Sequence, residues 1–274
     1  MPVKGIDGYI PPGSLRDILK SNSNRFVTQP GESVMDAANR LNLFDLGEIK
    51  ERNKTLPLHQ KLSAPQEVKA TGPVEVVPDD VKKICSTLDR LNHQVLRDDT
   101  KNYNLNIVGL RNDDAEPNKF DDEMWVFWRF ENKWTLKKYK ITTDPGLSYL
   151  TDPIGEAGTA ILKEGQYSKA YRLGKHQGKY EALVQSQPLT VIRDFNRDGK
   201  LDFASGKEQT GFFGINIHRS SPTGESVFVN NWSAGCQVFA RITEYNEFIG
   251  LCKKAIAEWD NEFTYTLIRK SWIK

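Results

Sequence analysis

The spacing of hydrophobic residues along the chain changes near residue 98. Before that point, apolar residues recur every three or four positions, first over 34–41 and again over 80–98. This spacing predicts two helices. Ser33 is placed to cap the first helix, and Asp79 or Asp80 the second, because a short polar side chain there satisfies free backbone N–H groups. The apolar positions of the second helix are Val81, Ile84, Leu88, Leu91 and Val95.

Beyond residue 98 the pattern shortens to apolar runs that are typical of strands and are separated by turn residues. The runs are 104–111, 124–131, 134–141, 183–193, 212–218 and 263–268. Apolar residues over 243–259 have helical spacing instead. We therefore predict one mostly β domain of the α+β class over 99–274, with a helix or two packed on it.

The first third of the chain is organised differently. Residues 1–24 have the composition of a polar tail, and 66–79, with Pro73 and Pro78, that of a linker. Between them the sequence predicts a strand from Arg25, a Pro-Gly-Glu-Ser turn over 30–33, an alanine-rich helix, a second helix over 46–52 with Asn53 after it, and an extended piece over 60–62.

This β-α-α-β order over 25–65 resembles a LysM module. Such modules carry a P-G-[DE]-[ST] turn, an alanine-rich first helix and an Asn after the second helix. The resemblance implies binding to a glycan that contains N-acetylglucosamine, usually peptidoglycan. The alternative is a small packing or docking module, because LysM-like pieces also occur in phage tails and contractile injection machines.

Charge and composition narrow the partners and the compartment. Lys and Arg total 38 against 36 Asp and Glu, a net charge of +2, which argues against nucleic acid. No apolar run is long enough to cross a bilayer, and 1–19 lack the apolar core of a secretory signal. We therefore expect synthesis in the cytoplasm and delivery by a non-Sec route. The three cysteines have no CxxC spacing, which argues against a disulfide framework and structural zinc.

The segment with candidate chemistry runs from Gly214 to Phe239. It places His218 on a predicted strand and Cys236 in a Ser-Ala-Gly-Cys turn. A cysteine attacks as its thiolate, and an imidazole within hydrogen-bond reach lowers the thiol pKa and takes the proton. Gly235 lets the backbone approach an incoming carbonyl, and the Ser233 hydroxyl is placed to brace the turn.

This arrangement resembles the catalytic domain of L,D-transpeptidases, a β-sandwich whose motif is a strand-borne His followed by [ST]-His-Gly-Cys. The resemblance implies that His218 is the general base and Cys236 the nucleophile, with Ser233 and Gly235 at matching positions. Two positions depart from the motif. Ala234 replaces its second His, and Gln237 with Val238 follows where the family often has an Arg. The family's crosslinking reaction is therefore not transferred. The Ser-Ala-Gly-Cys variant is similar to a group of phage-encoded proteins.

Three further residues are candidates for substrate binding. Arg219 is expected either to hold a substrate carboxylate or to be a solvated charge at a strand end. His176, between Gly174 and Gly178, is expected to line the same cleft. Trp232 is expected to be a cleft wall or a packing residue. Cys252 lies on an apolar helical face and is predicted to be a core residue.

A second motif runs from Asp194 to Asp202. Its D-x-N-x-D-G-x-x-D spacing matches the first nine positions of an EF-hand loop, with Asp194, Asn196, Asp198 and Asp202 as candidate ligands of a structural calcium ion. Ser205 stands where the EF-hand has its bidentate Glu. The alternative is an acidic β-hairpin that turns at Asp198-Gly199.

Together these features predict a peptidoglycan-targeting cysteine enzyme that requires no cofactor. It would cleave or exchange an amide bond of the stem peptide through a thioester on Cys236, as a phage endolysin or a lytic component of a tail or injection particle. With water as acceptor the outcome is hydrolysis, and with an amine it is transpeptidation. The alternative is a non-catalytic adaptor that joins tail or baseplate parts, with Ala234 marking lost activity.

Overall fold

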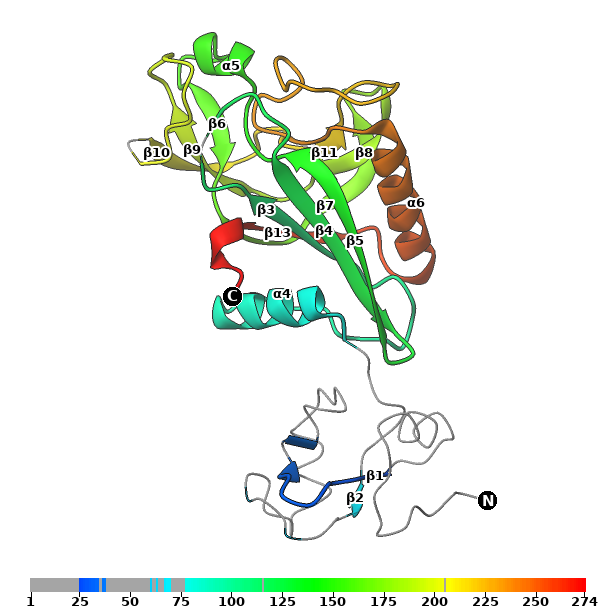
Figure 1. The fold of residues 1–274 in the computed structure, drawn as a ribbon. Coiled ribbons are helices and arrows are strands. Elements are labelled where there is room, and N and C mark those ends of the chain that lie inside the picture. Colours follow the sequence, from blue (N-terminus) through cyan, green and yellow to red (C-terminus); the bar gives the residue numbers. More distant parts are fainter. Residues whose placement is uncertain are drawn as a thin grey trace. The chain divides into compact units, whose positions relative to one another are not determined.

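A computed structural model describes residues 25–34, 36–37, 60, 63, 67–69, 77–114, 116–204 and 206–274 (Figure 1). The chain divides into two units, residues 1–78 with 132–134 and residues 79–131 with 135–274. The expected polar tail over 1–24 and most of the LysM-like module lie outside the described residues. The mostly β, α+β class predicted for the larger unit is confirmed.

In the smaller unit, β1 (Arg25–Val27) pairs antiparallel with β2 (Glu67–Lys69). The chain turns after β1 at Gly31, whose φ of +78° suits glycine. Ser33 caps the helical residues that follow, since its Oγ accepts the N–H of Asp36 at 3.0 Å while Asp36 Oδ2 accepts the N–H of Ser33. β2 lies inside the segment expected to be a linker, so part of 66–79 is strand.

The first helix of the larger unit is α4 (Asp79–Arg90), which is shorter than predicted. Asn92 adopts a φ of +57°, the N–H of His93 donates to the Leu88 carbonyl, and the N–H of Asn92 donates to that of Asp89. This is a Schellman cap, which ends a helix. The predicted extension to residue 98 is therefore wrong. Val95 continues the apolar spacing because it is buried in the extended segment that follows.

Eight strands of the larger unit close into a barrel in the order β11-β12-β5-β4-β3-β13-β7-β8. Two neighbouring pairs, β11 with β12 and β3 with β13, are parallel. The strands are β3 (Asn106–Arg111), β4 (Asp122–Phe130), β5 (Lys133–Thr142), β7 (Gly165–His176), β8 (Tyr180–Gln185), β11 (Ile217–Arg219), β12 (Gln237–Phe239) and β13 (Phe263–Arg269).

A separate three-stranded sheet lies beside the barrel, in the order β10 (Lys207–Gly211), β9 (Leu189–Asp194), β6 (Thr159–Leu162). The short helix α5 (Leu147–Thr151) adjoins it, because Thr159 Oγ1 donates to the Tyr149 carbonyl. On the other side, α6 (Ile242–Glu258) packs on β11 and β12 (Figure 1). The 3₁₀ turn η2 (Lys270–Trp272) follows β13.

The helix α6 packs into the main hydrophobic core of the larger unit. Phe248 of α6 lies with its ring centroid 5.0 Å from that of Phe239 on β12, and both side chains are fully buried. Cys252, one turn further along α6, is fully buried in the same cluster, as the apolar spacing of 243–259 predicts. The helix therefore packs against β12, the strand that follows Cys236.

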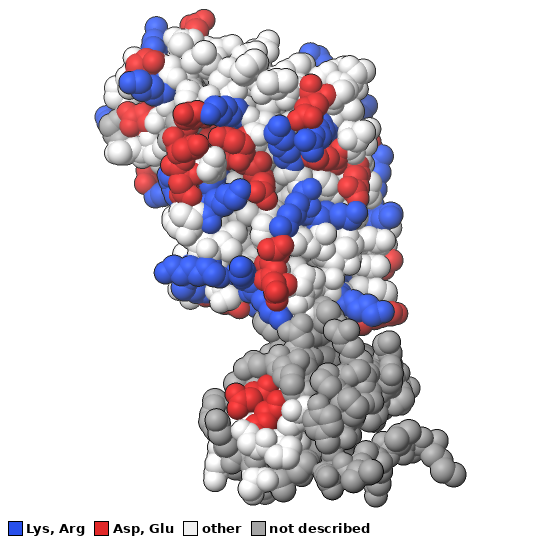
Figure 2. Space-filling model, in the orientation of Figure 1, with Lys and Arg blue, Asp and Glu red and all other residues white. Residues whose placement is uncertain are grey.

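Two predicted strands differ from the structure. The run over 183–193 forms two strands, β8 and β9, which are interrupted where Pro188 lacks a backbone donor. In the run over 212–218, only Ile217 and His218 are in a strand, because residues 212–216 bond through side chains and isolated backbone groups instead. On the visible face of the larger unit, acidic and basic side chains are intermingled (Figure 2).

Candidate active site

Two neighbouring parallel strands position His218 and Cys236. In the pairing of β11 with β12, Ile217 lies opposite Gln237 and His218 opposite Val238. Cys236 directly precedes β12, and the N–H of Gln237 donates to the Asn216 carbonyl at 2.9 Å. Because side chains alternate between the two faces of a sheet, Cys236 and His218 belong to the same face, offset by two positions.

The thiol of Cys236 is enclosed, with 9% of the residue exposed. Its Sγ accepts the backbone N–H of Asn216 at 3.4 Å and donates to the Gly214 carbonyl at 3.6 Å. Among the described residues, no hydrogen bond joins Sγ to the ring of His218. Burial raises the pKa of the thiol to about 11, although the Asn216 N–H favours the thiolate. The sequence predicts a lowered thiol pKa, whereas burial in this structure raises it.

The imidazole of His218 is held in one tautomer. Nδ1 lies 2.7 Å from the Arg219 carbonyl, which can only accept, so Nδ1 carries the proton and Nε2 has a free lone pair. The Tyr180 hydroxyl lies 3.1 Å from the same Nδ1. Burial, and then the neighbouring His176, lower the pKa of His218 to about 3. At neutral pH the site therefore holds a thiol and a neutral imidazole rather than an ion pair.

A second imidazole, that of His176, stacks on the ring of His218. The ring of His176, at the end of β7, stacks on that of His218 with centroids 4.0 Å apart. The Oδ1 of Asn216 accepts the N–H of Gln185, which turns Nδ2 toward His176 Nδ1 at 3.0 Å. The amide therefore donates, and His176 carries its proton on Nε2. Burial is the main cause that lowers the pKa of His176.

The turn before Cys236 is closed from within. The Ser233 Oγ donates to the Cys236 carbonyl at 2.8 Å and accepts the Gly235 N–H at 3.1 Å. Gly235 has a φ of +123°, and a Cβ there would lie 2.1 Å from the Ala160 carbonyl oxygen. Glycine is therefore the residue that fits. The Ser233 carbonyl in turn accepts the N–H of Gly146.

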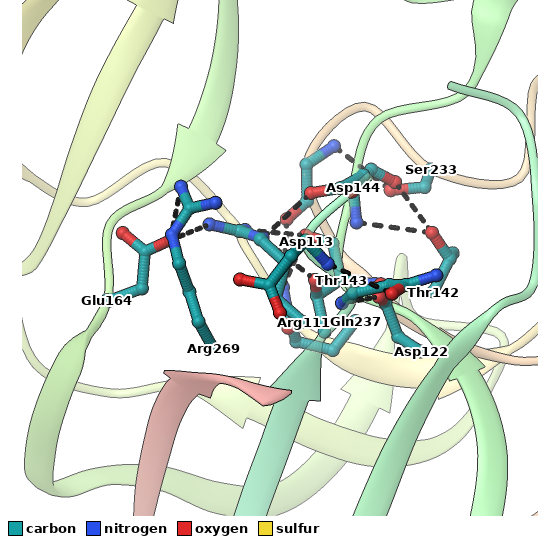
Figure 3. Close-up of polar contacts among 12 residues, drawn as sticks. Arg111, Asp113, Asp122, Thr142, Thr143, Asp144, Glu164, Ser233, Gln237 and Arg269 are labelled. Carbon is teal, nitrogen blue, oxygen red and sulfur yellow. Dashed lines mark hydrogen bonds and ion pairs between the residues drawn. The ribbon is translucent and has the colours of Figure 1, made fainter. Parts of the chain in front are cut away.

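A buried charged cluster lies beneath this turn (Figure 3). Arg111 of β3 is fully buried, with Nε 3.0 Å from Asp144 Oδ1 and Nη1 3.1 Å from Glu164 Oε1. Glu164 Oε1 also forms an ion pair with Arg269 Nη2, at 3.0 Å. Thr143 lies between these ion pairs, since its carbonyl accepts Arg111 Nη2 and its hydroxyl accepts Arg111 Nε. A buried arginine is stable only when its donors are satisfied in this way.

Gln237 connects this cluster to the turn. Its side chain is fully buried, and Nε2 donates to the carbonyls of Thr143 and Gly235 at 3.4 and 3.3 Å (Figure 3). Its Oε1 accepts the Tyr265 hydroxyl at 2.8 Å. Gln237 therefore lies in the core beneath the turn and not on the side of the Cys236 thiol. Val238, at the next position, is fully buried as well.

The other predicted binding residues lie at different distances from the pair. The Arg219 guanidinium is 4.0 Å from the ring centroid of Tyr180, and its Nη1 donates to the Ser220 carbonyl. Arg219 thus adjoins the imidazole through Tyr180. Trp232 is 38% exposed. In the part of the chain that the structure describes, no hydrogen bond or ring contact joins Trp232 to Cys236 or His218.

Two residues of this site were not given roles from the sequence. The sequence could have identified Asn216, because it lies two positions before His218 and alternating side chains put both residues on the same face of the chain. Tyr180 has no such signal, since it reaches the imidazole from a different strand. The four candidate calcium ligands lie elsewhere: Asp194 ends β9, and Asn196, Asp198 and Asp202 follow it in the segment before β10.

The fold and site define a β barrel in which a buried histidine on β11 and a buried cysteine directly before β12 belong to the same face of two parallel strands. No protein-family model, curated protein or solved structure matches the chain. None of the described helices is long and apolar enough to cross a membrane.

Proposed function

We propose that the chain is a cysteine enzyme that acts on the stem peptide of peptidoglycan. The observation that supports this most is the placement of Cys236, after a glycine that only a tight turn requires, beside the strand that carries His218. The finer assignment, an L,D-transpeptidase-like catalytic domain preceded by a LysM-like module over 25–65, belongs to the same proposal and rests on the sequence motifs. The β-sandwich expected from that resemblance differs from the closed barrel of the larger unit.

In this mechanism the neutral pair reacts by general-base catalysis. Sγ of Cys236 attacks the carbonyl carbon of an amide while the thiol proton passes to Nε2 of His218. The tetrahedral oxyanion collapses, the C–N bond breaks, and the leaving amine takes the proton from His218. The product is a thioester on Cys236. Attack by water then gives hydrolysis, and attack by an amine gives transpeptidation.

The backbone of the turn supplies a donor for the oxyanion. The Gly235 N–H is already bonded to Ser233 Oγ. The N–H of Cys236 donates no hydrogen bond within the described residues, so it is the group left to face a developing negative charge. Ser233 then acts as a positioning residue, because it fixes the turn from both sides.

The proposed setting is the bacterial cell wall. The LysM-like module would bind the glycan, and the Cys236 domain would act on the attached peptide, after release as a phage endolysin or on a tail or injection particle. Such particles open walls, which favours hydrolysis over crosslinking. Arg219, His176 and Trp232 are the proposed substrate contacts.

A second candidate function, a non-catalytic adaptor of a tail or baseplate, is supported by a different observation. The thiol is nine-tenths buried and protonated at neutral pH, and it is not hydrogen-bonded to His218. An inert core cysteine would have these properties. Ala234, in place of the family's second His, fits this alternative too.

Mass spectrometry of purified muropeptides incubated with the full chain tests the proposal. We expect new products from the wild type and none from Cys236→Ala or His218→Ala. Cys85→Ala is the matched control, since Cys85 is buried on α4 away from the pair, and this variant should retain activity. A folded wild type that releases no product and forms no covalent adduct on Cys236 would favour the adaptor.

A further inference from the structure

A buried carboxylate oxygen at the end of β9 has no hydrogen-bond donor. Asp194 is 2% exposed, and its Oδ2 accepts the N–H of Asp202 at 3.2 Å. Its Oδ1 is buried without a partner within the described residues. A buried carboxylate oxygen in this state destabilises a fold unless a cation or a donor reaches it.

The nearest cation along the chain is engaged elsewhere. Arg193 donates from Nη1 to the Gly158 carbonyl and from Nε to Gln209, and its guanidinium lies 4.9 Å from the ring centroid of Phe213. Side chains alternate along β9, so Arg193 points away from the face that carries Asp194. Arg193 therefore does not neutralise Asp194, and within the described residues the chain offers this carboxylate only the backbone N–H groups of Asp202 and Asn196, with no cation.

The loop that follows Asp194 gathers further oxygen atoms. Asn196 Oδ1 accepts the N–H of Asp198, and Asp198 Oδ1 accepts the N–H of Lys200. Arg197 and Gly199 have φ values of +61° and +75°, so the backbone reverses tightly. The Oδ2 of Asp194 accepts the N–H of Asp202 from the far end of the loop. Burial first, and then the charges of Asp202 and Asp198, raise the pKa of Asp194, so the three carboxylates lie near one another.

We propose that this loop binds one calcium ion. The ligands are the carboxylates of Asp194 and Asp198, the amide oxygen of Asn196 and the carbonyl of Lys200, with Asp202 acting through a water. These are positions 1, 3, 5, 7 and 9 of the loop pattern, where position 9 commonly binds through water. All the donors are oxygens, which suits calcium and not zinc or copper.

The acidic side chains alone do not make the site. In the described part of the chain, no three His, Cys, Asp or Glu side chains converge as a metal site. The proposed site needs only two carboxylates in direct contact, because an amide and a main-chain carbonyl complete it. The bidentate Glu of position 12 is replaced by Ser205. We therefore expect weak binding, with Kd about 0.1–1 mM, the range of extracellular modules.

The site has a structural consequence for the neighbouring helix. A Cβ on Gly199 would lie 3.1 Å from Leu147 Cδ1 and 3.4 Å from Thr151 Cγ2, so the loop packs directly on α5. The residue before α5, Gly146, donates to the Ser233 carbonyl. Calcium would thus fix the loop against the helix whose first residues adjoin the Cys236 turn. The proposal itself is independent of any catalytic role for Cys236.

The test is calorimetric titration of the chelator-treated full chain with CaCl₂, together with melting curves in CaCl₂ or MgCl₂ at equal ionic strength. We expect one bound calcium and a rise in melting temperature of about 3–11 °C at about 10 mM CaCl₂. Magnesium should give less, because it demands a smaller octahedral site.

Two variants and a control complete the test. Asp194→Asn and Asp198→Asn should abolish the calcium response; Asp198 is exposed, so this change leaves folding intact. Asp98→Asn changes another exposed loop aspartate with its own local bond, to Thr100, and should keep the full response. No calcium heat in the wild type, an equal rise with magnesium, or an unchanged response in Asp198→Asn would overturn the proposal.

Discussion

The ring of His176 stacks on the ring of His218, with centroids 4.0 Å apart and planes inclined by 20°. Two imidazoles this close cannot both carry a proton without strong repulsion. The Asn216 amide keeps Nδ1 of His176 as an acceptor, and the Arg219 carbonyl keeps Nδ1 of His218 as a donor. The stack therefore favours two neutral rings and leaves Nε2 of His218 as a base.

The neutral state of His218 predicts acid sensitivity. Its pKa is lowered to about 3 in the folded protein, so an unfolded His binds a proton below about pH 6.5 that the folded one does not. Stability is then fully present above pH 6.5 and falls as the pH drops toward 3, by up to about 1.4 kcal/mol per pH unit. Urea unfolding from pH 7 to pH 4 should show a shallower loss in His218→Gln. His93→Gln, a partly buried control, should change the slope less.

The Cys236 thiol should react slowly at neutral pH in the absence of substrate. Because its pKa is raised to about 11, the thiolate fraction and the iodoacetamide rate should increase about tenfold per pH unit from pH 7 to pH 10. Cys252 is fully buried and should stay unlabelled until the protein unfolds. Peptide mapping of the labelled protein measures both rates. A rate at Cys236 that levels off below pH 8 would contradict the raised pKa.

Gly235→Ala should damage the turn. The new Cβ would lie 2.1 Å from the Ala160 carbonyl oxygen, and alanine disfavours the φ of +123° that Gly235 adopts. We expect the two effects to lower the free energy of unfolding by about 3 kcal/mol or more. Gly214→Ala is the matched control, since its φ of +69° is strained but its Cβ meets nothing within 4 Å. It should cost about 1 kcal/mol. Similar denaturation midpoints for the two variants would refute the close approach at Gly235.

Gln237→Leu should destabilise the fold by about 2–3 kcal/mol. It leaves the Tyr265 hydroxyl and the carbonyls of Thr143 and Gly235 buried without their partner. Gln187→Leu, at an exposed position between β8 and β9, should change stability by less than about 0.5 kcal/mol. Chemical denaturation measures both, and a loss below about 1 kcal/mol in Gln237→Leu would contradict the bridging role.

The LysM-like module is tested by deletion. Removing residues 1–70 should weaken sedimentation with insoluble peptidoglycan. It should leave the melting of the larger unit nearly unchanged, because that unit begins at Asp79 and has its own core. The full chain is the reference, and equal sedimentation of the truncated protein would rule out glycan binding by the module.

Local patterns predicted the strands whose residues alternate between apolar and polar or form an apolar run. The structure contains β3, β4, β5, β13 and helix α6 close to their predicted ranges. The sequence did not reveal β7, because its exposed positions include Ser168 and Lys169 and only the barrel buries Ala170 and Tyr171. Nor did it reveal the cap at Asn92, where a left-handed residue ends α4 while the apolar spacing continues.

The site was predictable where its residues are close in sequence. One turn contains Ser233, Gly235 and Cys236, and His218 lies on β11, the strand that pairs with the strand after this turn. Tyr180 reaches the site through the pairing of β8 with β11, which no local pattern encodes. The sign of the thiol pKa shift also depends on tertiary structure, since burial outweighs the single N–H donor.

The position of β13 sets an order for folding. It lies between β3 and β7, so the barrel stays open during synthesis until residues 263–269 have left the ribosome. β3 pairs with β13 across most of the sequence of the unit, and such distant pairing is slow. β13 also brings Tyr265, whose hydroxyl bonds Gln237 beneath the Cys236 turn. The hydrogen bonding beneath the Cys236 turn is therefore completed late, after translation has passed both His218 and Cys236.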